Sequence, residues 1–134
     1  MEDIFVARLM SSDLQAVGPD TLVEDAATQM QDNSVGSLVV VDEDNQLLGI
    51  LTTTDFVDIV AKSKPKAQTT VERYMTTDVV TTDAQTSIVD AADMMIEHGI
   101  HHLPVIDDDE GVIGMISTTD LAGYISSVQT PSPA

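Results

Sequence analysis

The chain has 134 residues, and 5 Lys or Arg against 23 Asp or Glu give it a formal net charge of −18 at pH 7. Its length fits one domain or one pair of small repeats, and its 43% apolar residues are enough for a core. The acidity argues against nucleic-acid and membrane-surface partners, because both are bound through clustered Lys and Arg. The absence of cysteine excludes disulfides, thiol catalysis and cysteine-based zinc sites.

The N-terminal residues carry acids where a secretory signal has basic residues, and no apolar run has the roughly 18 residues of a membrane span. We therefore expect a cytoplasmic protein. The charge favours a halophilic cytoplasm of molar salt, where the Debye length is about 3 Å and surface carboxylates repel one another less. An acidic surface without salt adaptation is the alternative.

In chain order, the first expected elements are a short strand, a helix, two strands and a second helix. The first helix begins near Thr21 with its apolar residues on one face, and the next two strands are runs of branched residues around an acidic turn, typical of a buried hairpin. The expected ranges are 14–17 for the first strand, 38–41 and 47–51 for the hairpin, and 54–61 for the second helix. Residues 62–70, which include Pro65 and all three lysines, form a linker.

The same order of elements returns after the linker. Residues 71–125 align with residues 6–60 at a constant offset of 65, without a gap, and 17 of the 55 aligned positions are identical. The second copy predicts a strand at 79–82, a helix from near Thr86 to Gly99, strands at 103–106 and 112–116, and a helix at 119–127. The segment 128–134 has the composition of a disordered tail.

The number of copies bears on the fold. Two copies indicate a pseudo-twofold pair, since a solenoid needs three or more. A unit of about 55 residues with a sheet covered on one side does not easily bury its apolar face alone. We therefore expect an α/β fold in which two β-α-β-β-α repeats, 6–61 and 71–127, pack face to face.

Both copies carry one pattern between the hairpin and the last helix: Gly, two aliphatic residues, a hydroxyl residue, two spacers and Asp. These residues are Gly49 to Asp55 and Gly114 to Asp120. Hydroxyls and free amides at a helix N-terminus can cradle an anion, and an Asp in the first turn can accept hydrogen bonds from a ribose diol. The alternative is that the hydroxyl residues only cap the helix and the Asp complements its dipole.

The segment from Val6 to Ile125 resembles a tandem pair of cystathionine β-synthase (CBS) domains, a Bateman module. The resemblance rests first on the two Gly-x-x-Thr/Ser-x-x-Asp motifs. It extends to residues 99–107 of the second copy, to the Asp-Ala-Ala sequences at 25–27 and 90–92, and to the segments Met10–Asp13 and Met75–Asp78 that open the copies, here called the leading segments.

The resemblance implies a regulatory module, not an enzyme, that binds an adenosine derivative such as AMP, ADP, ATP or S-adenosylmethionine in clefts between the repeats. It implies that one cleft is lined by Thr52, Asp55, Val80 and His102, and the other by Ser117, Asp120, Gln15 and Ser37. It further implies a homodimer and an effector protein that receives the signal. A ligand-free dimerisation scaffold, whose motifs are only helix caps, is the alternative.

One departure from the family bears on the ligand. Where relatives that bind phosphate-rich nucleotides often have Arg or Lys, this chain has His102 and Ser37. The ligand therefore carries few phosphates, or is a cation such as S-adenosylmethionine, or has its charge compensated by a cation or by high salt.

No catalytic or metal centre is expected. His98, His101 and His102 span a helix end and a strand, and their spacing does not make them converge on a metal ion. The sequence has no nucleophile–base pair with a suggestive spacing and no Walker lysine. We therefore expect no catalytic cofactor.

Overall fold

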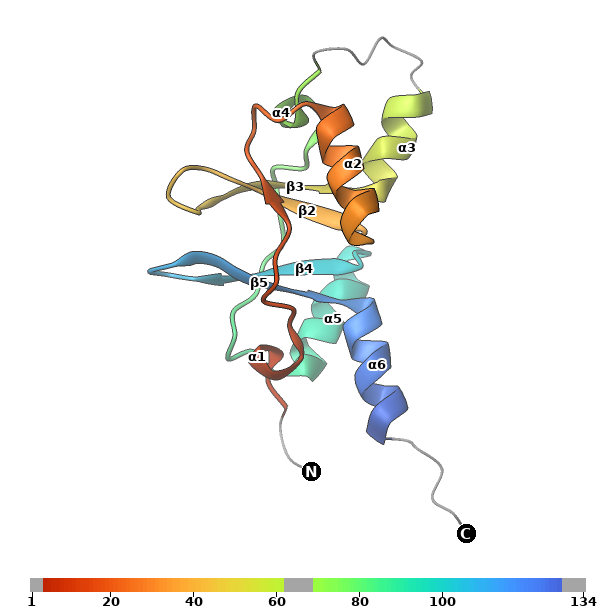
Figure 1. Ribbon diagram of the computed structural model, residues 1–134. Coiled ribbons are helices and arrows are strands. Elements are labelled where there is room, and N and C mark those ends of the chain that lie inside the picture. The colour runs from red at the N-terminus through yellow and green to blue at the C-terminus, as the bar shows by residue number, and fades with distance from the viewer. Residues whose placement is uncertain (1–3, 62–68, 129–134) are drawn as a thin grey trace. The chain divides into compact units, whose positions relative to one another are not determined.

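The computed structural model describes residues 4–61 and 69–128 (Figure 1). These residues divide into two compact units. The first-copy unit contains residues 13–61, 69–79 and 109–112, and the second-copy unit contains residues 4–12, 80–108 and 113–128. The mixed helix and strand content confirms the α/β class. No helix in the described ranges is both long and apolar enough to cross a membrane.

The first-copy unit is built on a three-stranded sheet in the order β1-β2-β3. The strands are β1 (Ala16–Val17), β2 (Ser37–Val41) and β3 (Leu47–Thr52), and the helices are α2 (Val23–Asn33), α3 (Thr53–Ala61) and α4 (Val71–Tyr74). β1 runs parallel to β2, and β2 pairs antiparallel with β3 as the expected hairpin. Helix α2 packs on β2, and α3 packs on β3. The predicted order of strand, helix, strand, strand and helix is confirmed in this copy.

The apolar face of α2 explains why this segment is a helix. Val23, Ala26 and Met30 are buried, at the spacing that puts side chains on one side of a helix, and they join the core with Leu38 and Leu51 of the hairpin. The helix ends at Ser34, whose φ of 53° is left-handed.

The two long helices begin near Thr21 and Thr86 as expected, and in each copy the N-cap is the next residue. The N-cap of α2 is Leu22, which makes no side-chain cap bond, whereas Ser87 caps the second copy's helix by accepting a hydrogen bond from the Asp90 N–H at 3.1 Å. The Thr86 hydroxyl instead donates to the Asp83 carboxylate at 3.1 Å. Gly99 ends that helix with a φ of 63°, as expected.

The second-copy unit contains a two-stranded sheet, β4-β5. Its elements are α1 (Val6–Leu9), α5 (Ile88–His98), β4 (His102–Asp107), β5 (Gly111–Ser117) and α6 (Thr118–Val128), with the first two residues of β5 assigned to the other unit. Helices α5 and α6 pack on each other, and α5 packs on β4. Since α6 reaches Val128, the predicted tail begins too early; residues 129–134 lie outside the described residues, as do residues 62–68 of the linker.

The strand expected at 79–82 is reduced to one parallel bridge between Thr82 and Val105. In the first copy, the N–H of Val39 donates to the carbonyl of Gln15 at 3.2 Å. The residue aligned with Val39 is Pro104, which has no N–H to donate. The pairing of residues 79–82 with β4 in the second copy therefore lacks this hydrogen bond.

Each leading segment folds with the opposite copy. Ser11 pairs antiparallel with Met115 of β5, and Thr76 pairs with Ile50 of β3. The short helices α1 and α4 precede these bridges and were not expected from the sequence. Val6 of α1 and Val71 of α4 are fully buried, which anchors each segment in its unit. The compact units thus differ from the sequence repeats 6–61 and 71–127 in their first residues and in residues 109–112.

Candidate functional site

The repeated motif of the first copy lies where β3 passes directly into α3. Thr52 is the last residue of β3, and Asp55 lies in the first turn of α3. The Asp55 Oδ2 accepts hydrogen bonds from the Thr52 N–H at 2.8 Å and from the Thr52 hydroxyl at 3.3 Å. This carboxylate therefore satisfies a free N–H at the start of the helix and is held in one orientation.

The second copy repeats this geometry at the junction of β5 and α6. The Asp120 Oδ2 accepts from the Ser117 N–H at 2.8 Å and from the Ser117 hydroxyl at 3.0 Å. In return, the Asp120 N–H donates to the Ser117 Oγ at 3.2 Å. These reciprocal bonds form a capping box with Asp in the position usually held by Glu or Gln.

One oxygen of each motif carboxylate is left over. Within the described residues, Oδ1 of Asp55 and Oδ1 of Asp120 accept no hydrogen bond, and both side chains are half-buried. A carboxylate oxygen is a strong acceptor. Each motif can therefore offer a fixed, charged acceptor to a hydroxyl or amine of a ligand while the other oxygen maintains the cap.

The glycine of each motif has a structural reason that the sequence alone did not give. A Cβ at Gly49 would lie 2.8 Å from the Thr76 carbonyl oxygen and from the Met75 sulfur, and a Cβ at Gly114 would lie 2.6 Å from the Met10 sulfur. Because the leading segments pair with the strands at Ile50 and Met115, the residues that follow these glycines, only glycine leaves room for them.

The first-copy unit brings four predicted site residues to one end of its sheet: Gln15, Ser37, Thr52 and Asp55. Ser37, 8% exposed, opens β2 and pairs in register with Thr52, next to Asp55. Gln15 lies just before β1, and its side-chain oxygen accepts from Gln29 Nε2 at 3.3 Å. Symmetry about the hairpin turn would have paired Ser37 with Leu51, but an irregularity between Val40 and Val41 shifts the register by one residue and brings Ser37 opposite Thr52.

The second-copy unit brings His102 to its own motif. His102 opens β4, and the carbonyl of the preceding His101 accepts from the Thr118 N–H of α6 at 3.0 Å. Burial lowers the pKa of His102 below its ordinary 6.5, the neighbouring His101 lowers it further, and Asp120 opposes the shift. The negative charge of Asp120 thus favours the protonated form of His102. Val80, also half-buried, lies two residues before the Thr82 bridge to β4.

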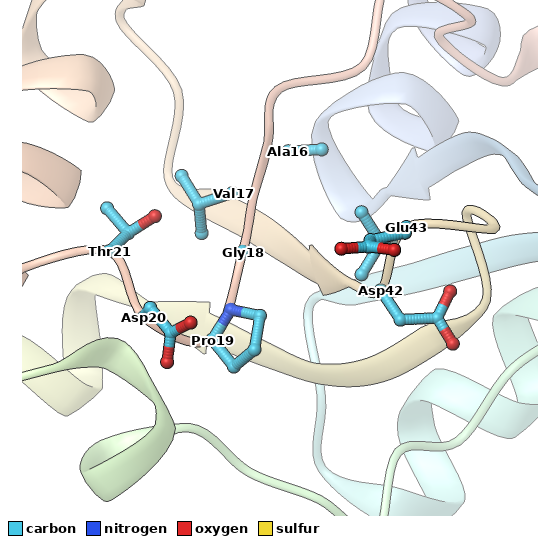
Figure 2. Close-up of a pocket in the computed structure, with 9 residues that line it drawn as sticks. Ala16, Val17, Gly18, Pro19, Asp20, Thr21, Asp42 and Glu43 are labelled. Carbon is cyan, nitrogen blue, oxygen red and sulfur yellow. The ribbon is translucent and has the colours of Figure 1, made fainter.

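A separate pocket lies at the opposite end of the first-copy sheet (Figure 2). Its volume is about 550 Å³. It is lined by strand β1 and the four residues that follow it, 16–21 in all, and by residues 41–43 at the end of β2. Asp20, Asp42 and Glu43 supply its charges, and Asp42 Oδ1 accepts from the N–H groups of Asp44 and Gln46 at 2.9 Å. The pocket contains none of the predicted site residues, and the Asp42 carboxylate serves the hairpin turn.

A comparison with known family models identifies the family of this chain. The family model described as "CBS domain" matches residues 6–62 and residues 71–127. The chain belongs to the CBS domain family. The tandem CBS pair inferred from the sequence is thereby confirmed.

Two curated relatives match most of this chain but differ in how much of their own length the match covers. A 17.7 kDa protein of Acidianus ambivalens is 35% identical over 125 residues, which are 93% of this chain and 75% of the relative. The homoserine O-acetyltransferase of Methanosalsum zhilinae is 35% identical over 127 residues, which are 95% of this chain but only 25% of the enzyme. The chain thus spans a quarter of that enzyme.

A solved structure shows a ligand-bound relative. The CBS domain pair of protein MJ0100, in complex with 5′-methylthioadenosine and S-adenosyl-L-methionine, is 25% identical and superimposes with a TM-score of 0.84. The match covers 91% of this chain and 99% of the other.

The family resemblance grouped the eight site residues across the copies, with Val80 and His102 beside Asp55, and Gln15 and Ser37 beside Asp120. The structure shows contacts within each CBS repeat, where Ser37 pairs with Thr52 and the carbonyl of His101, next to His102, accepts from the Thr118 N–H at the start of α6. The grouping across the copies stays a prediction.

Proposed function

We propose that this CBS pair is a regulatory module that binds an adenosine derivative at its two Thr/Ser-x-x-Asp motifs. The observation that carries the proposal is the pair of oriented carboxylates, each with Oδ1 lacking a protein donor within the described residues. A ribose diol would supply the two hydroxyl donors that such a group accepts. The complex of the MJ0100 CBS pair with two adenosine derivatives supports this ligand class.

The ligand would act by shifting the module between two states. Such a shift requires that the ligand bind one state more tightly than the other. We propose that the shift, in shape or in homodimer geometry, is passed to an effector protein in the cytoplasm. Exposed apolar side chains on the helices support self-association; they are Val57 and Val60 on α3, Val89 and Ile96 on α5, and Ile125 on α6.

The second candidate function is a ligand-free scaffold whose motifs are only helix caps. The complete capping box of Ser117 and Asp120 favours it, because its hydrogen bonds need no ligand to explain them. A test must therefore separate the capping role of each Asp from a binding role.

Replacing each motif Asp by Glu separates the two roles, because Glu is the usual capping-box residue but moves the carboxylate outward by one methylene group. If the motifs bind adenosine derivatives, Asp55→Glu and Asp120→Glu should each weaken binding by about tenfold or more while stability changes by less than about 1 kcal/mol. Isothermal titration calorimetry with AMP, ATP and S-adenosylmethionine at high salt measures the affinities, and urea unfolding measures the stability.

The matched controls are Asp55→Ala and Asp120→Ala. Each should lose the helix cap, which lowers the free energy of unfolding by about 1 kcal/mol, and should also lose ligand binding. If none of the three compounds binds the unaltered protein, the scaffold is the better description. The same holds if the Glu variants bind as tightly as the unaltered protein.

A further inference from the structure

The first-copy unit contains a pair of bonded amides that the second copy lacks. The Nε2 of Gln29 on α2 donates to the Gln15 Oε1 at 3.3 Å and to the Ala16 carbonyl at 3.3 Å. The residues aligned with this pair, 65 positions later, are Val80 and Met94, which are half-buried and pack against the core of the second-copy unit. Both members of the pair therefore differ between the copies, as two amides in one and two apolar side chains in the other.

These two hydrogen bonds fix the direction in which the Gln15 amide faces. The Ala16 carbonyl can only accept, so the Gln29 atom that meets it must be the amide nitrogen. An amide nitrogen can only donate, so the Gln15 atom that meets it must be the oxygen. The Nε2 of Gln15, with its two N–H donors, is thereby turned away from Gln29, and it donates to none of the described residues.

Both glutamines are held by the backbone around them. The Gln15 carbonyl accepts from the Val39 N–H of β2 at 3.2 Å, and the Gln29 carbonyl accepts from Asn33 Nδ2 at 2.8 Å. Met30, next to Gln29, is 5% exposed and anchors this turn of α2 in the core. Both glutamine side chains are half-buried. A donor held in this way loses little further side-chain entropy when it meets a ligand.

We propose that Gln29 is a positioning residue for ligand binding: by engaging the oxygen of Gln15, it presents the Gln15 N–H groups to an acceptor atom in the base or the phosphate of an adenosine derivative. The inference rests on the proposed function, in which Gln15 is a predicted site residue. This donor complements the motif carboxylates, which only accept. The second copy, with Val80 and Met94 in these places, has no such donor.

A double-mutant cycle tests whether Gln29 acts through Gln15. The variants are Gln15→Val, Gln29→Met and the two together, and the double variant reproduces the pair that the second copy already packs. Gln31→Met is the matched control, because it makes the same change at an exposed residue of α2 whose side chain bonds to no described residue. Isothermal titration calorimetry at high salt measures the affinities, and urea unfolding measures the stability.

Gln29→Met should weaken the binding of AMP at one of two calorimetric sites by about fivefold, within the contribution of one neutral hydrogen bond. Gln15→Val should weaken it by a similar factor, and the double variant should bind no more weakly than Gln15→Val alone. Gln31→Met should bind as the unaltered protein does. Affinity losses that multiply in the double variant would overturn the proposal, and so would a Gln29→Met variant that loses stability but keeps its affinity.

Ligand analogues separate the two sources of the acceptor. Adenosine lacks the phosphate of AMP, and 1-deaza-, 3-deaza- and 7-deazaadenosine each lack one ring nitrogen. If the acceptor is a phosphate oxygen, the effect of Gln29→Met should be present with AMP and absent with adenosine. If it is a ring nitrogen, the effect should be present with adenosine and absent with one deaza compound. An effect of equal size with all of these compounds would contradict the proposal.

Spectra of the unaltered protein decide the question if a variant fails to fold. In ¹⁵N–¹H correlation spectra, added AMP should shift the side-chain N–H signals of Gln15 and leave those of Gln31 in place. If the compounds bind but these signals stay unshifted, or the cycle shows no coupling, this inference is wrong and the proposed function stands. If no compound binds the unaltered protein, the proposed function is wrong and the inference fails with it.

Discussion

The hydroxyl of Thr82 is a buried polar group without a hydrogen-bond partner among the described residues. Thr82 is only 7% exposed, and its Oγ1 has no hydrogen-bond partner in the described part of the chain. The aligned residue of the first copy is Val17, which is 8% exposed and belongs to the core. An unpaired buried hydroxyl costs about 1–3 kcal/mol. The second copy therefore carries a local loss of stability that the first copy avoids.

Replacing Thr82 by Val should stabilise the protein by about 1 kcal/mol, because a methyl group of nearly the same shape replaces the unpaired hydroxyl. The free energy of unfolding from urea titrations measures the change, with an unchanged m-value showing that both end states are retained. Val17→Thr is the matched control and should be destabilising. A loss of stability in Thr82→Val would mean that the hydroxyl has a partner in solution, such as a buried water.

At the scale of the elements, the hairpins and long helices were predictable because their signals are local. The buried runs of β2 and β3 and the apolar face of α2 are periodic within one stretch of chain. The placement of the leading segments was not predictable. Helices α1 and α4 are single turns, and their structure depends on contacts with residues that are far away in the sequence. The motif pattern was visible in the sequence, but its glycine could be explained only after Thr76 was found against Gly49.

Gly49→Ala tests this contact between elements. The new Cβ would meet a backbone oxygen, that of Thr76, at 2.8 Å, so the leading segment must shift and stability should fall by about 1–3 kcal/mol. Thermal and urea unfolding measure the loss. Gly123→Ala is the control, because it lies in α6 with nothing within 4 Å and should stabilise the helix by up to about 1 kcal/mol. Equal effects of the two substitutions would contradict a close approach at Gly49.

At the scale of the whole molecule, the acidic residues that the structure describes lie where solvent ions can reach them. No acidic residue in the described ranges is buried, and the two described arginines, Arg8 and Arg73, are exposed. The compact state therefore concentrates carboxylates that repel one another with few cations nearby. Dissolved salt shortens the range of this repulsion from about 10 Å at 0.1 M to about 3 Å at 1 M.

We therefore expect the melting temperature and the free energy of unfolding to rise from about 0.05 M to about 1 M KCl and then to level off, because the Debye length is already as short as about 3 Å at 1 M. Circular dichroism melts across this series measure the effect. Sucrose is the control: it stabilises compact states by exclusion from their surface and screens no charge, so it should not reproduce the steep rise at low concentration. A melting temperature that is the same at both ends of the KCl series would show that the acidity is not an adaptation to salt, and the carboxylates would then have to be explained by solubility alone.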